Sequence, residues 1–292
     1  MRSIEEYIKD AFKYSYSDIK NFIVGGLLFS ISTVIAVIFN IYLLKYVHPY
    51  FLMADISKII VLFVVAMLSL LIIGIITNGY LVRVMKTTVE GSDILPNWDN
   101  IVELFIKGLL FTIGNIILAI IFFVIPIILI ALGIFSSIKS VLGLIFLILG
   151  FVILLISGIA YFFYSLLAEV NFSIKGFFGF FEFKKIFKMI SLKYVVLVIL
   201  IMIIGIIINI IVSLPFVLLS ILLTPHQMLY SYSVYHTITP SIVILQLIEG
   251  IIKGFVTFFM MIFTGRGVAL YYKDKVEVWY PKIISHRQII KK

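Results

Sequence analysis

Six long runs of apolar residues constrain the fold of this 292-residue chain more than any other feature. Each is longer than the roughly 20 residues that an α-helix needs to cross a bilayer. Each also lacks the polar alternation of a membrane β-barrel strand, and a helix satisfies its own backbone hydrogen bonds. The sequence therefore predicts an all-α membrane protein with six transmembrane helices, at residues 21–44, 59–82, 108–138, 140–168, 194–225 and 241–265.

The composition excludes a soluble domain of this length. Hydrophobic residues make up 63% of the chain and charged residues 13%, which leaves too little polar surface to cover such a domain. We expect a single polytopic membrane domain over residues 1–292. The absence of cysteine excludes disulfides, thiolate metal sites and cysteine nucleophiles. The charged start is too long and acidic, and the first apolar run too long, for a cleaved signal peptide.

The basic residues predict the topology. Of the 23 Lys and Arg residues, 19 lie in residues 1–20, 83–107, 169–193 and 266–292, whereas three lie in the alternate loops and one in the sixth run. Cytoplasmic segments carry such an excess. We therefore predict a plasma-membrane protein with both termini in the cytoplasm. The positive charge also favours anionic lipids at the cytoplasmic face of the bilayer, and not nucleic acid, as partners.

A pattern of short amphipathic stripes suggests an internal repeat. Apolar residues recur at helical spacing from Ile4 to Phe12, behind a capping box formed by Ser3 and Glu6. Weaker stripes precede the third and fifth runs. We predict three units of an interfacial helix plus a transmembrane hairpin, at about 1–92, 97–176 and 177–275, with a short cytoplasmic tail at 276–292. The alternative is six helices whose basic flanks merely anchor their inner ends.

Pro126 and Pro215 each fall late in the first apolar run of a unit. A proline inside a helix removes a backbone hydrogen bond, so we expect a kink at each position. Such a kink can open a cavity or serve as a hinge, although proline is also ordinary in membrane helices.

Glu249 and Lys253 are ionisable residues inside the sixth run, with Gln246 on the same side. Their spacing of four residues favours an ion pair on one helix face. Charges within a span are a functional hypothesis by default. The site is either part of a polar pathway or a structural pair whose cost snorkelling relieves. Gly250 and Gly254 bracket the pair, and we expect this face to pack closely on another helix.

Asparagines recur in the first runs of the three units, at Asn40, Asn115 and Asn209. They are candidates for the lining of a pore, but hydrogen bonds between helices are the interpretation that we favour.

No catalytic motif is present in the sequence, which lacks HExxH, a Walker loop and GxSxG. The spacing of His48, His226 and His236 matches no metal motif, so we predict no metal site and no cofactor. Four carboxylates near the inner face could serve a lipid-modifying enzyme, but loop solvation and helix capping are the simpler explanation, which we favour: Glu90, Asp93, Asp99 and Glu103.

The polar stretch between the second and third runs reads GYLVRVMKTTVEG and then LPNWDNIVELFIKG. Its order resembles the signature of a family of prokaryotic integral membrane proteins called domain of unknown function 4013. The AEVNF…FEFKKIFKMI segment at 168–190 and the later TGRGVALYYKD are also similar to that family. The resemblance implies a membrane protein and supplies no catalytic residues. The positions that carry it best are Gly79, Arg83, Gly91, Pro96, Trp98 and Gly108.

These features leave three functional hypotheses. The first is a transporter or channel-like permease, or an accessory subunit of one, because internal repeats and broken helices are typical of transporters. The second is a non-catalytic membrane scaffold or lipid-organising protein. The third is a lipid-modifying enzyme. A continuous polar cavity would favour the first, and a dry interior with exposed grooves would favour the second.

Overall fold

The computed structural model describes residues 1–46, 56–136, 140–223 and 240–279, and in that part of the chain all regular secondary structure is helical. Six helices are long and apolar enough to cross a membrane, which confirms the predicted all-α fold with six spans. They are α2 (Ile19–Tyr46), α3 (Ile56–Glu90), α4 (Ile101–Phe135), α5 (Val141–Lys175), α7 (Leu192–Leu223) and α9 (Pro240–Trp279). Three shorter helices accompany them: α1 (Ile4–Tyr14), the 3₁₀ helix η1 (Phe177–Phe181) and α6 (Phe183–Met189).

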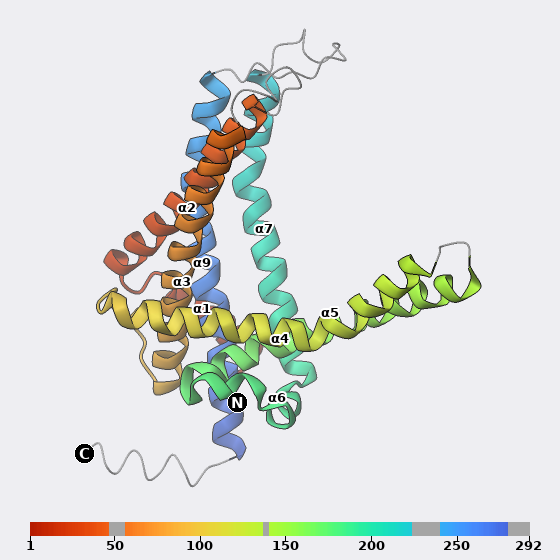
Figure 1. Ribbon diagram of the computed structural model, residues 1–292. Helices are drawn as coiled ribbons and strands as arrows, with labels where there is room; N and C mark the ends of the chain where they lie inside the picture. The colour runs from red at the N-terminus through yellow and green to blue at the C-terminus, as the bar shows by residue number, and fades with distance from the viewer. Residues whose placement is uncertain (47–55, 137–139, 224–239, 280–292) are drawn as a thin grey trace.

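The six long helices form two arms that diverge from a common base (Figure 1). The bundle arm contains α2, α3, α7 and α9. The hairpin arm contains α4 and α5, which pack on each other and project away from the bundle. At the base lies a group of segments that we call the polar collar, which comprises residues 1–20, 79–108, 171–193 and 266–276. It holds α1, η1, α6 and the loop between α3 and α4.

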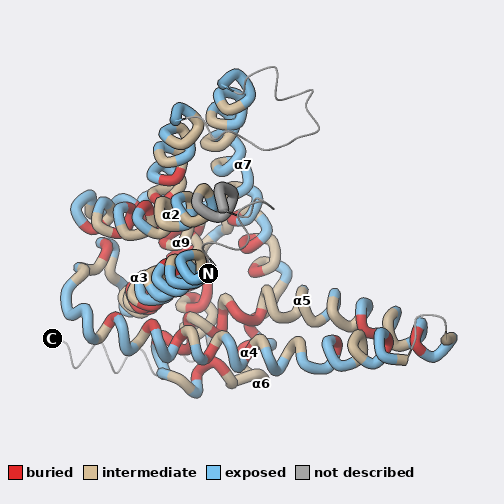
Figure 2. Tube along the Cα trace, turned by 45° about the horizontal axis from the view of Figure 1, so that its top comes forward, coloured by how far each residue is buried: buried red, intermediate tan, exposed pale blue. Residues whose placement is uncertain are grey.

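Burial is concentrated where the two arms meet (Figure 2). One continuous core joins side chains from α1, α3, α4, α5, α7 and α9, including Tyr7, Tyr164, Tyr194 and Tyr271. The outer parts of the arms leave most of their apolar side chains exposed, up to 87% for Phe135 near the hairpin tip. Such exposure suits a hydrocarbon solvent, which is as apolar as the side chains themselves.

Helices α2 and α9 pack through small residues, as expected for the face that bears Gly250 and Gly254. A Cβ atom at Gly254 would lie 2.4 Å from the backbone nitrogen of Ser30. The Ser30 hydroxyl donates to the carbonyl of Ile251 at 2.8 Å, and the Thr33 hydroxyl donates to the carbonyl of Gly250. The predicted close packing of this glycine face is confirmed.

Several helices extend beyond the predicted spans. Helix α3 continues through its basic residues to Glu90, and α9 continues to Trp279, so part of the predicted tail belongs to a transmembrane helix. Residues 101–107 are the first turns of α4 and not a separate helix. Only the first and third predicted units therefore begin with a short helix of their own, α1 or α6, and the threefold repeat stays a prediction.

Helix α1 has its predicted capping box, in which Ser3 and Glu6 bond each other's backbone. Its buried residues Tyr7, Ala11 and Tyr14 pack against the protein, chiefly α9 and α7. Helices α4 and α7 run without interruption through Pro126 and Pro215. The kinks at these two prolines stay a prediction.

Candidate functional site

The polar collar begins at a close crossing of α3 and α4. A Cβ atom at Gly79 would lie 1.9 Å from the carbonyl oxygen of Leu104, and one at Gly108 would lie 1.7 Å from that of Ile75. Real Cβ atoms do not approach a backbone oxygen so closely, so only glycine fits at these two positions. The two backbones therefore touch, and this contact fixes where the hairpin arm leaves the bundle.

The loop after α3 folds back over this crossing. The rings of Tyr80 and Trp98 stack with their centroids 3.7 Å apart and an interplanar angle of 1°. The Tyr80 hydroxyl donates to the carbonyl of Pro96 at 2.8 Å, and the Trp98 indole nitrogen donates to the carbonyl of Asn21 at 2.9 Å. The first bond ties the loop to α3, and the second ties it to the start of α2.

Arg83 holds the same loop from the other side. Its guanidinium pairs with the carboxylates of Asp99 and Glu103, the second at 3.2 Å, and donates to the carbonyl of Asn97 at 2.7 Å. Glu103 also pairs with Lys107, one turn further along α4. The two carboxylates that sequence analysis considered for chemistry here are therefore engaged in ion pairs that organise the loop.

Arg266 is the most buried cation of the collar, with 3% of its side chain exposed. Its guanidinium pairs with Asp10 of α1 at 2.8 Å and with Asp93 of the α3–α4 loop at 2.9 Å. It also donates to the carbonyl of Ser92 and lies 4.2 Å from the centroid of the Tyr14 ring. One side chain of α9 thus joins three segments that are far apart in the sequence.

A second buried polar group lies where α5 meets η1, α6 and α9. The Asn171 amide nitrogen donates to the carbonyl of Gly179 at 2.7 Å and to the carboxylate of Glu182 at 3.0 Å. Its oxygen accepts hydrogen bonds from the amine of Lys185 at 2.9 Å and from the Tyr272 hydroxyl. Asn171 is fully buried and makes contacts with both its donor and its acceptor atoms.

Electrostatics distinguish the two charged members of this group. Burial, together with the nearby charge of Lys175, lowers the pKa of Lys185 to about 8. Burial acts to raise the pKa of Glu182, but hydrogen bonds from Lys175 and Asn171 outweigh it and hold that pKa below its usual value. Lys185 consequently changes its charge nearer to neutral pH than a solvated lysine does.

The N-terminus of the chain is held against the end of α9. Asp274 accepts from the guanidinium of Arg2 at 3.0 Å and from the Tyr7 hydroxyl at 2.8 Å. Burial and the bond to Asp274 raise the pKa of Tyr7. The amine of Lys193 bonds the carbonyl of Arg2, which brings the start of α7 to the same point.

The model of a family described as "Protein of unknown function (DUF4013)" matches residues 61–219, which include the α3–α4 crossing and its loop. This chain belongs to the DUF4013 family. An uncharacterised protein of Methanocaldococcus jannaschii is 46% identical and aligns over 95% of this chain and 99% of its own length. A second uncharacterised protein of that organism is 38% identical, over 94% and 99%. No solved structure matches this chain.

The DUF4013 signature positions cluster in one part of the collar. Gly91 ends α3 with a φ of 98°, a left-handed conformation that residues with a side chain rarely adopt. Gly79 and Gly108 form the crossing, Trp98 stacks on Tyr80, and Arg83 pairs with Asp99 and Glu103. The signature residues that share the loop and the two adjoining helix segments are Gly79, Arg83, Gly91, Pro96, Trp98 and Gly108.

The ion pair predicted within the sixth span is present. The Lys253 amine lies 2.6 Å from a carboxylate oxygen of Glu249, and both side chains are partly exposed. Gln246 is exposed. The structure therefore contains the local pair that the spacing indicated, on a helix face beside the glycines that contact α2.

The three asparagines do not join this pair. Asn209 donates to the carbonyl of Gly205 at 2.9 Å and Asn115 to that of Phe111 at 3.3 Å, four residues earlier in its own helix in each case. Asn40 is exposed. Among the described residues, no hydrogen bond links these three asparagines to one another or to the Glu249–Lys253 pair.

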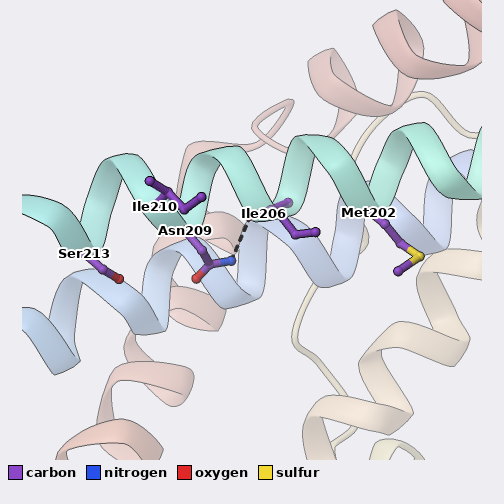
Figure 3. A pocket seen from close by; sticks show the side chains of 6 residues that line it. Met202, Ile206, Asn209, Ile210 and Ser213 are labelled. Atoms are coloured by element: carbon purple, nitrogen blue, oxygen red, sulfur yellow. Dashed lines mark hydrogen bonds between the residues drawn. The ribbon is translucent and has the colours of Figure 1, made fainter.

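Two cavities flank α7, and both are mainly apolar. The larger, about 480 Å³, runs along one side of α7 beside Asn209 and opens widely to the surroundings (Figure 3). The smaller, about 210 Å³, lies where α5, α7 and α9 converge, and its lining includes Phe162, Leu166, Ile201, Gly205 and Met260. The smaller cavity is thus an apolar recess at the junction of the arms, whereas the larger is an open recess along α7.

The remaining predicted positions do not gather into a metal or catalytic centre in the described part of the chain. His48, His226 and His236 lie outside the described residues. No group of three metal-ligating side chains occurs among the residues that are described. Glu90 pairs loosely with Lys86 at 4.0 Å.

Sequence analysis missed the residues that organise the collar. Arg266 and Asn171 stand inside segments that were quoted only for their family resemblance, and their partners lie up to 256 residues away. Glu169 was treated as part of a polar segment at the end of a span, although it lies inside α5 beside Asn115. The usable signal was the presence of ionisable or amide residues within otherwise apolar helices.

Proposed function

We propose that this protein is a non-catalytic, multi-pass protein of the plasma membrane that organises anionic lipid at the cytoplasmic face. The polar collar lies at that face, because it carries the excess of basic residues. The observation that carries the proposal is an apolar cavity at the junction of the arms, lined by α5 and α7, which are connected by a segment with exposed basic and aromatic side chains.

The cavity suits an acyl chain. Its volume of about 210 Å³ is lined almost wholly by apolar side chains, and it lies between helices that diverge from the collar. A cavity between transmembrane helices faces hydrocarbon, and lipid chains are the apolar molecules present there at the highest concentration. An apolar recess offers no hydrogen-bonding groups that an aqueous solute would need.

The basic surface suits the headgroup of the same lipid. Helices η1 and α6 connect α5 to α7, which both line the cavity. Lys184 and Lys188 are exposed on α6, and the aromatic rings of Phe187 on the same helix and Phe178 on η1 are exposed as well. Aromatic and basic side chains together are typical of the membrane interface, where each lysine adds attraction to anionic lipid.

The absence of catalysis is part of the proposal. Glu103 and Asp99 are paired with Arg83, and Asp93 with Arg266, so these carboxylates stabilise the collar. A lipid-modifying enzyme would need such groups directed at a cleft.

The permease hypothesis retains one supporting observation, the presence of ionisable side chains inside the spans at Glu169, Glu249 and Lys253. The apolar character of the cavities gives more support to lipid organisation.

The lipid proposal is tested by native mass spectrometry of protein purified with mixed anionic and zwitterionic phospholipid. Gly205→Leu fills the cavity, because a Cβ there meets only the flexible end of Met260 at 2.9 Å. Gly158→Leu is the matched control, since a Cβ at Gly158 meets nothing within 4 Å. We expect Gly205→Leu to reduce the amount of retained lipid about tenfold, which corresponds to about 1.4 kcal/mol of binding free energy. The control variant should retain as much lipid as the unchanged protein.

The headgroup half of the proposal is tested in the same measurement. The double variant Lys184→Gln with Lys188→Gln should still retain lipid but lose the preference for anionic headgroups. Lys9→Gln with Lys13→Gln on α1 is the control of equal charge change. Equal lipid retention and selectivity in all four variants would refute the proposal.

A further inference from the structure

Glu169 and Glu249 are carboxylates within long apolar helices, and their surroundings differ. Glu249 has a cation at 2.6 Å, the amine of Lys253, so its charge is balanced on its own helix. Glu169 of α5 forms no ion pair with any described residue. A carboxylate in hydrocarbon without a cation is unstable as an anion. Lys253 therefore stabilises an ionised Glu249, whereas no cation of the described chain stabilises an ionised Glu169.

Glu169 lies well inside its helix. It precedes the end of α5 at Lys175 by six residues, or about 9 Å of helix rise. Its carboxyl group faces the side chain of Asn115, which comes from α4. The other titratable groups near it are the phenols of Tyr161 on α5 and Tyr194 on α7. Tyr194 donates its proton to the carbonyl of Phe163 and so does not bond Glu169.

Asn115 has an unsatisfied acceptor at this contact. Its amide nitrogen bonds the carbonyl of Phe111, whereas its Oδ1 atom is buried and has no hydrogen-bond partner among the described residues. A buried polar atom without a partner is costly and calls for an explanation. An ionised Glu169 offers only acceptors, but a protonated carboxyl offers both a donor and an acceptor. A protonated Glu169 therefore complements the amide at both of its ends.

We propose that Glu169 and Asn115 form a proton-binding site between α4 and α5, in which the Glu169 carboxyl holds a proton and donates it to the Asn115 Oδ1 atom. The proton balances the carboxylate charge that no lysine or arginine of the described chain balances. Loss of the proton would leave an anion at the base of the hairpin arm, next to the cavity lining at Leu166. The site stands apart from the proposed lipid function and does not depend on it.

The test uses the full protein in lipid nanodiscs and a membrane-soluble carbodiimide, a reagent that modifies protonated carboxyl groups in apolar surroundings. Labelled positions are located by mass spectrometry of peptides over a range of pH. We expect labelling at Glu169 at neutral pH, a decline as pH rises, and at least tenfold weaker labelling at the ion-paired Glu249. Lys253→Met removes the partner of Glu249 and should make that residue reactive as well, which shows that the reagent reaches both helices.

Glu169→Gln is the variant that keeps the fold, because glutamine also has a donor and an acceptor for the Asn115 amide. It should fold with an unchanged unfolding midpoint and lose the label. If Glu169 stays unlabelled although the reagent labels Glu249 in the Lys253→Met variant, the proposal is overturned. Protection of Glu169 by Na⁺ at constant pH would also overturn it, because the site would then hold a metal cation.

Discussion

The polar collar and the hairpin arm are built on opposite principles. In the collar, charged and amide side chains from distant segments satisfy one another, as Arg266 does with Asp10 and Asp93. In the hairpin arm, α4 and α5 pack through glycine and aliphatic contacts, such as Gly133 against Leu147 and Gly150 against Ile130. The structure of the collar depends on directional hydrogen bonds and ion pairs, whereas the structure of the arm depends on the close fit of two apolar helix surfaces.

This difference follows from the solvent. Hydrocarbon is as apolar as a leucine side chain, so burying an apolar face against another helix gains little in a bilayer. An arm whose outward faces are purely apolar can therefore remain surrounded by lipid, as the exposure of α4 and α5 indicates. Polar groups must find partners, so the collar fixes the relative position of the six helices. Variants should affect stability in proportion to how directly they disturb the collar.

The largest effect is expected at the backbone crossing where the arm leaves the collar. Gly79→Val places atoms against the carbonyl of Leu104, 1.9 Å from an ideal Cβ, and no rotamer relieves a backbone clash. We expect a loss of about 3 kcal/mol or more, seen as a failure to purify folded protein or a strongly lowered unfolding midpoint. Gly74→Val on the same helix is the control, because nothing lies within 4 Å of that position. Equal stability of both variants would mean that the crossing does not hold the arm.

Removal of the buried guanidinium should come next. Arg266→Met keeps the side-chain length but leaves Asp10, Asp93 and the carbonyl of Ser92 without their donor. Breaking a buried pair costs about 3–5 kcal/mol. We expect about 2 kcal/mol, because Asp93 is 85% exposed and can be rehydrated. The unfolding midpoint in detergent measures the change.

Lys86→Met is the control for that variant, since the exposed Lys86–Glu90 pair at 4.0 Å should contribute under about 1 kcal/mol. An Arg266→Met variant as stable as this control would show that the collar depends on packing and not on its ion pairs.

Local features of this architecture were predictable from the sequence, and distant ones were not. The Glu249–Lys253 pair and the glycine face of α9 follow from helical spacing alone, and the structure contains both. The six spans follow from the lengths of the six apolar runs. The bonds of Arg266 join positions 256 residues apart, and no periodicity encodes such a partner.

The divergence of the arms was equally beyond sequence reasoning. An apolar helix face is compatible with lipid and with another helix alike, so its hydropathy cannot say which it meets. Asn115 illustrates the same limit within one side chain. Its type suggested hydrogen bonding between helices, but only the structure places Glu169 beside it.

The pH dependence of stability tests the second polar group of the collar. The pKa of Lys185 is about 8 in the folded protein, below the value of 10.5 that is usual for a solvated lysine. Between these two pH values the unfolded chain binds more protons, so stability should rise with pH through this window and be lowest below pH 8. We expect a gain of about 1 kcal/mol after solvent screening, since the side chain is 19% exposed.

Lys185→Met should remove that rise, as measured by unfolding midpoints at intervals across the same window. Lys184→Met, at the exposed neighbouring position, should retain it. A rise of the same size in both variants would assign the pH dependence to another group and leave the Asn171 cluster without an electrostatic role.

The smallest effect should occur where polar bonds act within the bundle arm itself. Ser30 and Thr33 of α2 donate to the carbonyls of Ile251 and Gly250 on α9. Hydrogen bonds between membrane helices average about 0.6 kcal/mol, because the separated helices find other partners. Ser30→Ala and Thr33→Val should each lower the unfolding free energy by about that amount, whereas Ser32→Ala, which removes only a bond to Leu28 in its own helix, should lower it by less. If Ser30→Ala proved as damaging as Arg266→Met, directional bonds would govern the arms as strongly as the collar, and the contrast between the two regions would fail.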